Sequence, residues 1–405
     1  LADAASISDD SRRKEAVKWA IESESQYRLR AALDLAKKEP PLSDAGDNWD
    51  ADPFLLGTGN GVIDLRTGEL RAARPEDRMI LNTMVSYDPS ALCPRFEQFL
   101  QEIFPKNEEL ICFLQKAIGY CLTGDVTEQV LFLCHGAGAN GKGTLIETIR
   151  CVLASYAQNL PFSTFERDTR SSISNDLATL VSKRFVTASE TNENVKFNEG
   201  RIKTLTGGDR ITARFLYGEY FEFDPTAKFW LSVNHLPRVT DYSHGFWRRV
   251  RLIPFLARFD GEQRDNNLKE ALRAEGCGIL TWAVRGCQQW QAEGLGTPAA
   301  VKEATALYQR ESDPLRKFLE ENYEIFSDGF VASATLNRDY KAWAAENDER
   351  QIPPRELSCR LKAHGFKEAR AGHERTRGWR GWRRKEGVVV SRCADMRTDA
   401  DTVLQ

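Results

Sequence analysis

A glycine-rich stretch with one lysine is the part of this sequence best suited to bind phosphate. Residues 130–134 form a short apolar run that is typical of a buried parallel strand, and apolar residues recur at helical spacing after Lys142. Glycines let backbone N–H groups approach a phosphate closely, and a helix N-terminus and a lysine add positive charge. The predicted nucleotide-binding residues are Gly136, Gly138, Asn140, Gly141, Lys142, Gly143 and Thr144.

The loop departs from the usual phosphate-binding pattern at one position. Gly136, Gly141 and Lys142 keep the G-x-x-x-x-G-K spacing, but Gly143 stands where a Ser or Thr hydroxyl usually meets Mg²⁺. The hydroxyl comes one residue later, at Thr144. A chance glycine-rich turn would also explain the glycines, but the flanking strand and helix favour a phosphate site. The sequence therefore predicts ATP and Mg²⁺ as cofactors, with Thr144 as a metal ligand.

Further polar residues follow or precede apolar runs in an order that suits an ATP-hydrolysing site. The reaction needs a carboxylate near Mg²⁺ and the attacking water, a polar group at the γ-phosphate, and positive charge for the transition state. Glu190 and Asn234 each end an apolar run, and Arg248 and Arg249 precede another. Each residue alone is more often a surface charge or a turn former. Their order favours a catalytic set, with Glu190 also at the metal.

Composition indicates an ordinary globular chain. With 405 residues, 41% hydrophobic and 28% charged, it is long enough for roughly two to three domains with a sizeable core. No apolar run approaches the length of about eighteen residues that a membrane span needs, and no signal-peptide pattern opens the chain. Nine cysteines without a C-x-x-C pair argue against a zinc site and favour reduced thiols in a cytoplasmic protein.

Hydrophobic patterns divide the chain into three regions that differ in predicted secondary structure. Helices are expected at 8–38 and 94–122, a small β-hairpin at 47–70, alternating strands and helices after 128, and mostly helix at 265–325, where Asp313 is expected to cap a helix that begins at Pro314. The fold class is therefore α/β, with a P-loop ATPase domain between two smaller domains. The expected bounds are a mainly helical N-terminal domain at 1–125, the ATPase domain at 126–312, a third domain at 313–390 and a tail at 391–405.

Positive charge gathers near the end of the chain. Residues 355–386 hold eleven Lys or Arg and four Glu, although the whole chain has a net charge of −3. Helices are expected at 336–345 and 355–364, and Arg alternates with Trp379 and Trp382 in the stretch that follows. This pattern suits the wing of a winged-helix DNA-binding domain. The predicted DNA contacts there are Arg377, Arg380 and Arg383; the alternative is a solvated basic tail.

Several sequence blocks together resemble a known family. They are Asn60 to Leu65 with Thr67-Gly68, Gly119-Tyr120 with Leu122 to Gly124, Gly138 to Lys142, Ser189-Glu190, Ile202-Lys203 with Thr206 to Asp209, Arg214, Asn234, and Trp247 to Arg249. In this order they resemble superfamily 3 helicases of the phage/plasmid and poxvirus primase–helicase type. The resemblance is close over roughly residues 20–325 and loose beyond.

The resemblance implies a AAA+-like ATPase that forms a homohexameric ring around one DNA strand and moves 3′ to 5′. It implies that Lys142 contacts the β- and γ-phosphates, that Glu190 is the Walker B acid and that Asn234 is sensor 1. Arg248 or Arg249 would be the arginine finger in the neighbouring subunit's site. The Walker B pair is reduced to Ser189-Glu190, so one carboxylate serves both roles or Glu193 helps.

The family also implies a replicative helicase of a phage, plasmid or other mobile element. Its partners would be single-stranded and forked DNA and a primase that is fused upstream or associated; the chain begins at Leu1 rather than Met, as a fragment would. A hairpin between Asp209 and Asn234 would project into the ring channel. Arg214 would contact phosphate, Tyr217 would stack on bases and Lys203 would also bind DNA. An ordinary surface hairpin is the alternative.

Two other classes of function compete with the helicase. A small-molecule P-loop kinase has no need of a basic C-terminal domain, and about 130 residues before the loop fit it poorly. A DNA-binding replication initiator would use its ATP site to drive assembly rather than unwinding. It would keep the phosphate-binding loop and lose Glu190 or the arginines, which are present here. The sequence therefore favours the helicase.

Overall fold

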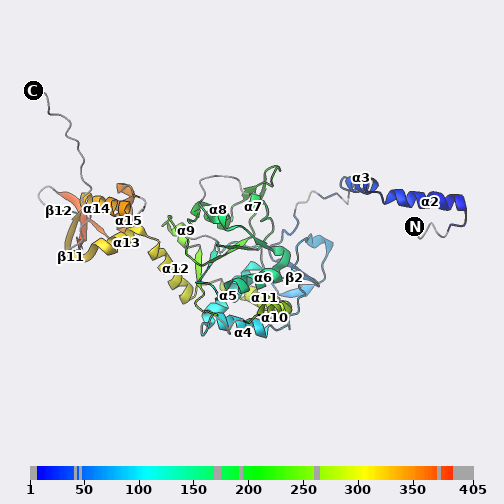
Figure 1. Ribbon diagram of the computed structural model, residues 1–405, viewed down its shortest axis with the longest axis horizontal. Helices are drawn as coiled ribbons and strands as arrows, with labels where there is room; N and C mark the ends of the chain where they lie inside the picture. Colours follow the sequence, from blue (N-terminus) through cyan, green and yellow to red (C-terminus); the bar gives the residue numbers. More distant parts are fainter. Residues whose placement is uncertain are drawn as a thin grey trace, which may run out of the picture.

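The computed structural model describes residues 7–40, 43–44, 48–167, 175–190, 195–259, 265–347, 349, 351–371 and 375–385. A central α/β body carries a small C-terminal domain on one side, and two N-terminal helices lie away from it on the other (Figure 1). Glu193 and the predicted tail at 391–405 lie outside the described residues. Among the described helices, none is both long and apolar enough to span a bilayer.

Helix was predicted over residues 8–38, and the structure forms two helices there, with a break that the sequence pattern did not predict. α2 (Asp10–Ser23) ends and α3 (Gln26–Ala36) begins on either side of Ser25. The Ser25 side chain accepts the N–H of Arg28, and its backbone is extended. A serine with this bond is a helix N-cap, so the chain starts a new helix instead of continuing the first. No residue of either helix is buried.

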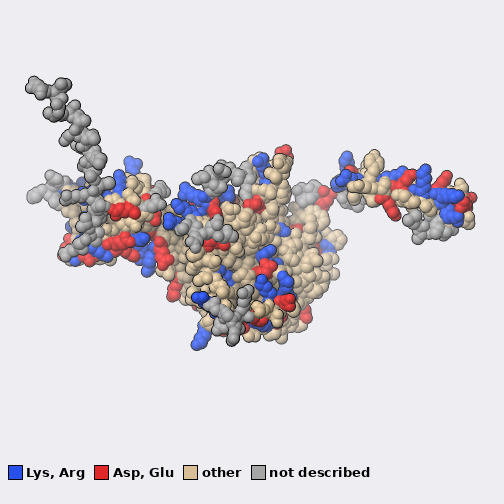
Figure 2. Space-filling view, viewed as in Figure 1, with Lys and Arg blue, Asp and Glu red and all other residues tan. Residues whose placement is uncertain are grey.

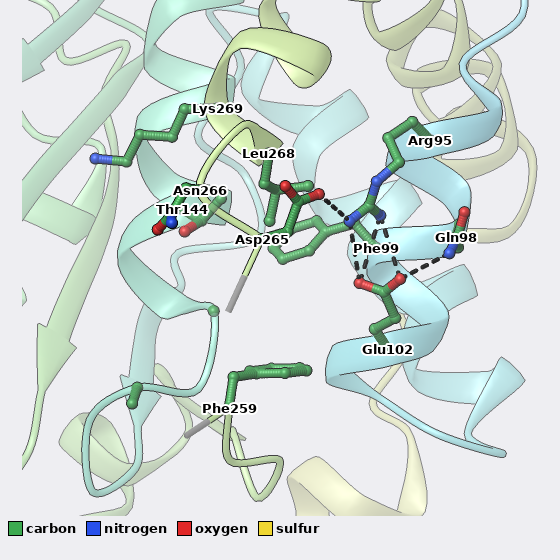
Figure 3. A pocket seen from close by; sticks show the side chains of 12 residues that line it. Arg95, Gln98, Phe99, Glu102, Thr144, Phe259, Asp265, Asn266, Leu268 and Lys269 are labelled. Atoms are coloured by element: carbon green, nitrogen blue, oxygen red, sulfur yellow. Dashed lines mark hydrogen bonds and ion pairs between the residues drawn. The ribbon is translucent and has the colours of Figure 1, made fainter. Parts of the chain in front are cut away.

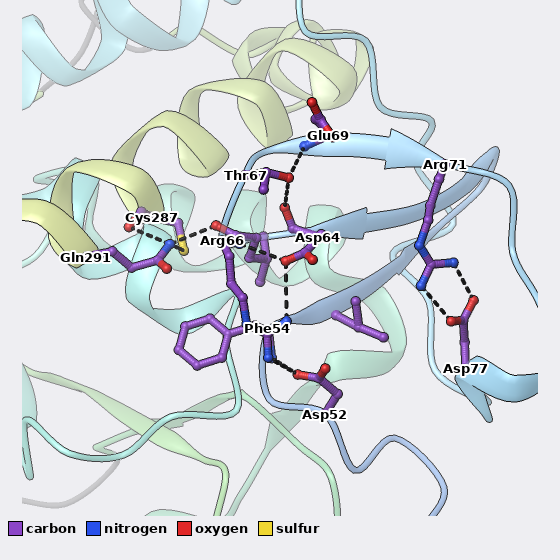
Figure 4. Close-up of polar contacts among 12 residues, drawn as sticks. Asp52, Phe54, Asp64, Arg66, Thr67, Glu69, Arg71, Asp77, Cys287 and Gln291 are labelled. Carbon is purple, nitrogen blue, oxygen red and sulfur yellow. Dashed lines mark hydrogen bonds and ion pairs between the residues drawn. The ribbon is translucent and has the colours of Figure 1, made fainter.

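A three-stranded antiparallel sheet takes the place of the predicted hairpin. Its strands, in spatial order, are β1 (Leu55–Thr58), β2 (Gly61–Asp64) and β3 (Glu69–Arg71). Asp64 accepts the N–H of Arg66 in the turn after β2, and Arg66 also pairs with Asp52 (Figure 4). Gln291 donates to the carbonyl oxygen of Leu65 at 2.7 Å. This bond ties the sheet to α11 (Gly276–Glu293), far along the chain.

One apolar core joins this N-terminal region to the rest of the body. Buried residues of α4 (Pro94–Ile103) and α5 (Glu108–Cys121) share this core with residues of β1 and β2, and α5 packs along α11. The rings of Phe96 and Trp282 meet edge to face, with centroids 5.2 Å apart. Buried residues from both sides of position 125 belong to this core. The domain bounds expected from the sequence stay predictions, and packing continues across position 125.

We expect Gly119→Ala to lower the free energy of unfolding by about 1–3 kcal/mol, the usual cost of overpacking. A Cβ at Gly119 would overlap the backbone of Gly286 and Cys287, so α5 and α11 would have to move apart. Gly276→Ala is the matched control, because a Cβ there would make only ordinary contact with Val85. Urea unfolding followed by circular dichroism measures both; equal midpoints for Gly119→Ala and the wild type would contradict the expectation.

The centre of the body is a five-stranded parallel sheet. Its order is β10-β4-β9-β6-β5, formed by β4 (Leu131–His135), β5 (Ala157–Asn159), β6 (Phe185–Ser189), β9 (Lys228–Val233) and β10 (Val250–Pro254). β4 and β9 are buried almost throughout, as the apolar runs predict. The register pairs Ser189 with Ser232 and His135 with Val233. The carboxyl ends of β4, β6 and β9 therefore meet at one edge of the sheet.

Helices and a separate hairpin surround the sheet. They are α6 (Lys142–Leu153), α7 (Asn175–Ala178), α8 (Glu199–Gly207), α9 (His244–Trp247), α10 (Leu268–Ala274), α12 (Ala299–Glu311) and the antiparallel pair β7 (Ile211–Ala213) and β8 (Phe221–Phe223). Short 3₁₀ turns lie at Pro75–Asp77, Ala154–Tyr156 and Phe162–Phe165.

The C-terminal domain has its own core. Its elements are α13 (Pro314–Asn322), β11 (Tyr323–Ala332), α14 (Ser333–Glu346), α15 (Pro354–Ala363), β12 (Lys367–Ala371) and β13 (Thr376–Arg384). The three strands form an antiparallel sheet in the order β11-β13-β12, and Trp379 is buried between sheet and helices. Asp313 caps α13 through the N–H of Leu315, ahead of Pro314. That cap was predicted from the sequence and is confirmed.

Candidate phosphate-binding site

The glycine-rich loop connects β4 to α6 at the carboxyl edge of the central sheet. Gly138 and Gly141 have φ values of 89° and 85°, in the left-handed region where other residues are strained. A Cβ at Gly141 would also overlap the side chain of Ile103. α6 begins at Lys142, so its free N–H groups face the loop. The glycines are thus required by backbone geometry and by close packing against α4.

Two side chains of the loop region bond to groups that follow the neighbouring strands β10 and β9. Asn140 donates to the carbonyl oxygen of Phe255 at 3.3 Å, just after β10. The buried Lys142 ammonium donates to the carbonyl oxygen of Gly136 and, at 3.1 Å, to Oδ1 of Asn234. Burial lowers the pKa of Lys142 below its ordinary value. Lys142 and Asn234, 92 residues apart in the sequence, are therefore neighbours in one site.

Glu190 lies beside Asn234 because β6 and β9 are adjacent and parallel. One carboxylate oxygen, Oε2, accepts the N–H groups of Asn234 at 3.0 Å and His235 at 3.1 Å. The other oxygen, Oε1, is buried and has no hydrogen-bond partner among the described residues. A buried carboxylate oxygen without a partner is costly unless a ligand, a metal ion or water completes it. Glu190 therefore has one oxygen that holds its orientation and one that is available for chemistry.

The structure separates the two adjacent arginines. Arg249 is buried and donates to the hydroxyl of Thr206 at 3.1 Å and to the carbonyl oxygen of Gly245. Arg248 is exposed and donates to the side chain of Gln129. The sequence treated the two as equivalent, whereas only Arg248 presents its guanidinium at the surface.

Both arginines lie at the opposite edge of the sheet from the loop. β10 runs parallel to β4, and its first residue, Val250, pairs with Leu131, the first residue of β4. The last residue of β4, His135, is four residues further along, about 13 Å away at about 3.3 Å per residue, and the loop follows it. Arg248 thus cannot reach the phosphate-binding loop of its own chain.

Two adjoining cavities border the loop. One, of about 580 Å³, is lined by loop residues, Ser232 and Asn234, and also by Lys269 and Arg273 of α10. The other, of about 1080 Å³, lies between α4, the loop and the start of α10 (Figure 3). Thr144 and Lys269 line both cavities.

The two cations of α10, Lys269 and Arg273, are site residues that were not predicted from the sequence. Lys269 and Arg273 belong to no motif and come more than a hundred residues after the loop, in a segment recognised only as helical. The signal that could have found them is their spacing of four residues, which places two positive charges on one helix face.

The residues at the loop fit Mg²⁺ with a nucleotide. The cradle of backbone N–H groups and Lys142 suit phosphate oxygens, Thr144 lines both cavities, and Oε1 of Glu190 has no hydrogen-bond partner in the part of the chain that the structure describes. A Cβ at Gly143 would meet nothing within 4 Å, so the first turn of α6 is open where the usual hydroxyl is missing. Mg²⁺ is commonly bound through one or two carboxylates together with substrate phosphates. Glu190 and the phosphate-binding loop could supply these two kinds of ligand.

The residues expected to bind DNA are not gathered at one place. Lys203 pairs with Asp241 and donates to the hydroxyl of Ser243 at 3.2 Å, so it is already engaged. Arg214 lies against the ring of Tyr220, 5.0 Å from its centroid. Tyr217, between β7 and β8, is 99% exposed. The hairpin therefore presents an aromatic tip, while Lys203 stabilises the loop before α9.

The C-terminal arginines differ in whether they form ion pairs within their own domain. Arg377 pairs with Glu368, and Arg383 pairs with Glu324 and lies over the ring of Phe326. Arg380 is exposed on β13. On the visible face of this domain, acidic and basic side chains lie interspersed (Figure 2). The charge excess of the sequence is thus partly neutralised within the domain.

Family profiles match two parts of the chain. The profile described as "D5 N terminal like" matches residues 1–105. A family of unknown function, DUF5906, matches residues 134–249, the region that contains the loop, Glu190, Asn234 and Arg248.

Several viral proteins with similar sequences are named as helicases or primases. "Putative helicase L207/L206" of Acanthamoeba polyphaga mimivirus is 29% identical over 67% of this chain and 31% of its own length. "Putative helicase 022R" of frog virus 3 is 25% identical over 83% of this chain and 43% of its own. "Putative primase C962R" of African swine fever virus is 26% identical over 55% and 24%, respectively. The chain thus spans a quarter to less than half of the length of these relatives.

A solved structure shares the fold. The apo structure of the NrS-1 C-terminal region is similar with a TM-score of 0.50 and 12% identity, covering 73% of this chain and 77% of that chain. This likeness supports the mixed α/β architecture and nothing finer. The D5 profile at the N-terminus and the viral relatives, taken together, support a D5-like primase–helicase family of the superfamily 3 type for this chain.

Proposed function

We propose that this chain is the ATP-hydrolysing helicase part of a viral, phage or plasmid primase–helicase. It assembles as a homohexameric ring, moves 3′ to 5′ on single-stranded DNA and opens forked DNA beside a fused or associated primase. The proposal rests on one observation, which is that the predicted catalytic residues lie at two opposite edges of the central sheet. The loop, Glu190 and Asn234 converge at one edge of the sheet, whereas Arg248 is exposed at the other. Each chain therefore carries the loop half of one ATP site and the arginine half of another. Two neighbouring subunits together complete a site.

The residues have separate roles in this proposal. When bound, Mg²⁺ neutralises phosphate charge and lowers the repulsion that an attacking oxygen meets. Lys142 exchanges its bond to Asn234 for the β- and γ-phosphates, which frees the Asn234 amide to contact the γ-phosphate. Glu190 keeps its orientation through Oε2 and uses Oε1 to hold the attacking water and take its proton. Arg248 of one subunit places its charge at the phosphates of the next.

Surface features support a DNA partner. The tip of the β7–β8 hairpin exposes Tyr217 and, nearby, Phe215 and Leu216, a group that suits stacking on unpaired bases. The C-terminal domain follows the order helix, strand, two helices and two strands, which suits a winged helix. All eight cysteines of the described residues are free thiols, in keeping with a cytoplasmic location.

The experiment that tests the proposal compares ATP turnover with and without single-stranded DNA, together with strand displacement on forks carrying a 3′ or a 5′ tail. We expect DNA to stimulate turnover and only 3′-tailed forks to be opened. Lys142→Ala, shown to be folded by circular dichroism, should lose both activities because the phosphate-contacting charge is gone. If ATP drives assembly on DNA without displacement of either fork, the chain is an initiator instead. Wild-type turnover by Lys142→Ala would overturn the assignment of the site.

A further inference from the structure

α10 presents two cations to the phosphate-binding cavity. Lys269 and Arg273 are four residues apart, so they share one face of the helix. α10 packs against α6, the helix that begins at Lys142, and both cations line the cavity that holds the loop. Figure 3 shows Lys269 beside Thr144 at the start of α6. The tertiary fold therefore brings a second cationic element over the loop.

The charge of the cavity is unbalanced. Its charged lining residues are Lys142, Lys269, Arg273 and one carboxylate, Glu147, which already pairs with Arg150 at 2.8 Å. Lys269 and Arg273 are exposed and have no carboxylate within ion-pair distance among the described residues. Three cations around one cavity with a single, engaged acid form a site for a polyanion.

The acidic residues at the two ends of α10 contact α4, whereas Glu270 lies on α10 itself and is not part of the cavity lining. Asp265, just before α10, pairs with Arg95 of α4 at 3.3 Å, and Arg95 also pairs with Glu102 (Figure 3). Glu275, after α10, accepts the N–H groups of Arg95 and Phe96 at 2.9 Å each and caps α4. These contacts fix both ends of α10 against α4. The helix is thus held at a set position relative to the loop.

We propose that Lys269 and Arg273 bind the phosphate chain of the nucleotide from α10, in the cavity that α10 and the loop line together. Arg273 contacts the terminal phosphate, because it shares its cavity with Ser232 and Asn234 at the end of β9. Lys269 contacts the inner phosphates, because it lines both cavities and so stands at their junction. The planar fork of an arginine suits two oxygens of a terminal phosphate, and the lysine acts as a point charge. This inference rests on the proposed function, since it takes the ligand to be a nucleoside triphosphate.

The test measures binding of a fluorescent ADP and a fluorescent non-hydrolysable ATP analogue to the full chain with Mg²⁺. A hydrogen bond to a charged group corresponds to at least about tenfold in affinity. Arg273→Ala should therefore weaken the ATP analogue by about tenfold or more and ADP by less than about twofold. Lys269→Ala should weaken both ligands by a similar factor, about tenfold. Lys302→Ala, which removes an exposed cation from α12, is the matched control and should change neither affinity.

The outcomes distinguish this inference from the proposed function. If both α10 variants bind both nucleotides as the wild type does, while Lys142→Ala loses binding, the inference is overturned and the ATP site stands. If Lys142→Ala binds normally as well, the site itself is wrong. A change confined to DNA affinity and its salt dependence would assign the two cations to DNA and also overturn the inference. Lys269→Gln and Arg273→Gln keep side-chain bulk and replace the alanine variants if those do not fold.

Discussion

Replacing Arg248 by alanine should lower ATP turnover by about 10³- to 10⁵-fold, the range measured for arginines that act on a neighbour's phosphates. ATP binding should stay near normal, because the loop of the same chain lies at the other edge of the sheet. Arg248 is exposed and its hydrogen bond to Gln129 is a surface contact, so the variant should keep its fold. Steady-state turnover and nucleotide affinity, measured on the same preparation, check both parts.

Arg249→Ala is the matched comparison for Arg248→Ala. It also removes one guanidinium from the same segment, but this group is buried and bonded to Thr206 and Gly245. Loss of a buried, charge-assisted hydrogen bond costs about 1.5–3 kcal/mol, so Arg249→Ala should mainly lower the midpoint of unfolding. If Arg249→Ala loses turnover with normal stability while Arg248→Ala is active, the finger is Arg249.

Mixing two inactive variants tests whether the site is shared. In a mixed ring of Arg248→Ala and Lys142→Ala subunits, some interfaces combine an intact loop with an intact arginine. ATPase activity should partly return on mixing, above the level of either variant alone. If labelled subunits are shown to exchange and activity does not return, the arginine does not complete a neighbour's site, or the ring works only when every site is intact. Either result would count against the proposal that two neighbouring subunits form one ATP site together and that such a site works independently of the others.

Glu190→Gln should abolish most ATP hydrolysis while ATP still binds. The glutamine oxygen can replace Oε2 in accepting the N–H groups of Asn234 and His235, so the loop after β9 should keep its shape. The variant lacks the carboxylate that takes the proton from water, and general-base catalysis contributes about 10²- to 10⁴-fold. A single-turnover assay with bound ATP measures the loss directly, without interference from product release.

Two controls make the Glu190 result decisive. Glu303→Gln removes an exposed carboxylate from α12 and should leave turnover unchanged. Unfolding of Glu190→Gln should show a normal midpoint, which excludes a structural cause. Full hydrolysis by a folded Glu190→Gln would contradict the assignment of Oε1 as the base, and Glu193 would then be the next carboxylate to replace.

The sequence alone was sufficient for features that depend on local conformation. The loop at 136–141 was recognisable because glycine is required where φ is positive, and the structure has Gly138 and Gly141 in that region. Glu190 and Asn234 were found because each follows an apolar run, and the carboxyl ends of parallel strands meet at one edge. Asp313 and Pro314 were recognised as a helix start through their own side-chain chemistry. The same local reasoning failed at Ser25, where it did not detect a second helix start.

Only the tertiary structure decided which charges are available to a ligand. Arg248 and Arg249 are identical and adjacent, and burial of one against Thr206 separates them. Lys203 fits the family pattern, yet Asp241 neutralises it. Lys269 and Arg273 carry no motif, and they reach the loop only because α10 is held against α4 and α6. The reason is that accessibility and charge pairing depend on segments far apart in the chain, whose approach is set by packing of the core rather than by local spacing.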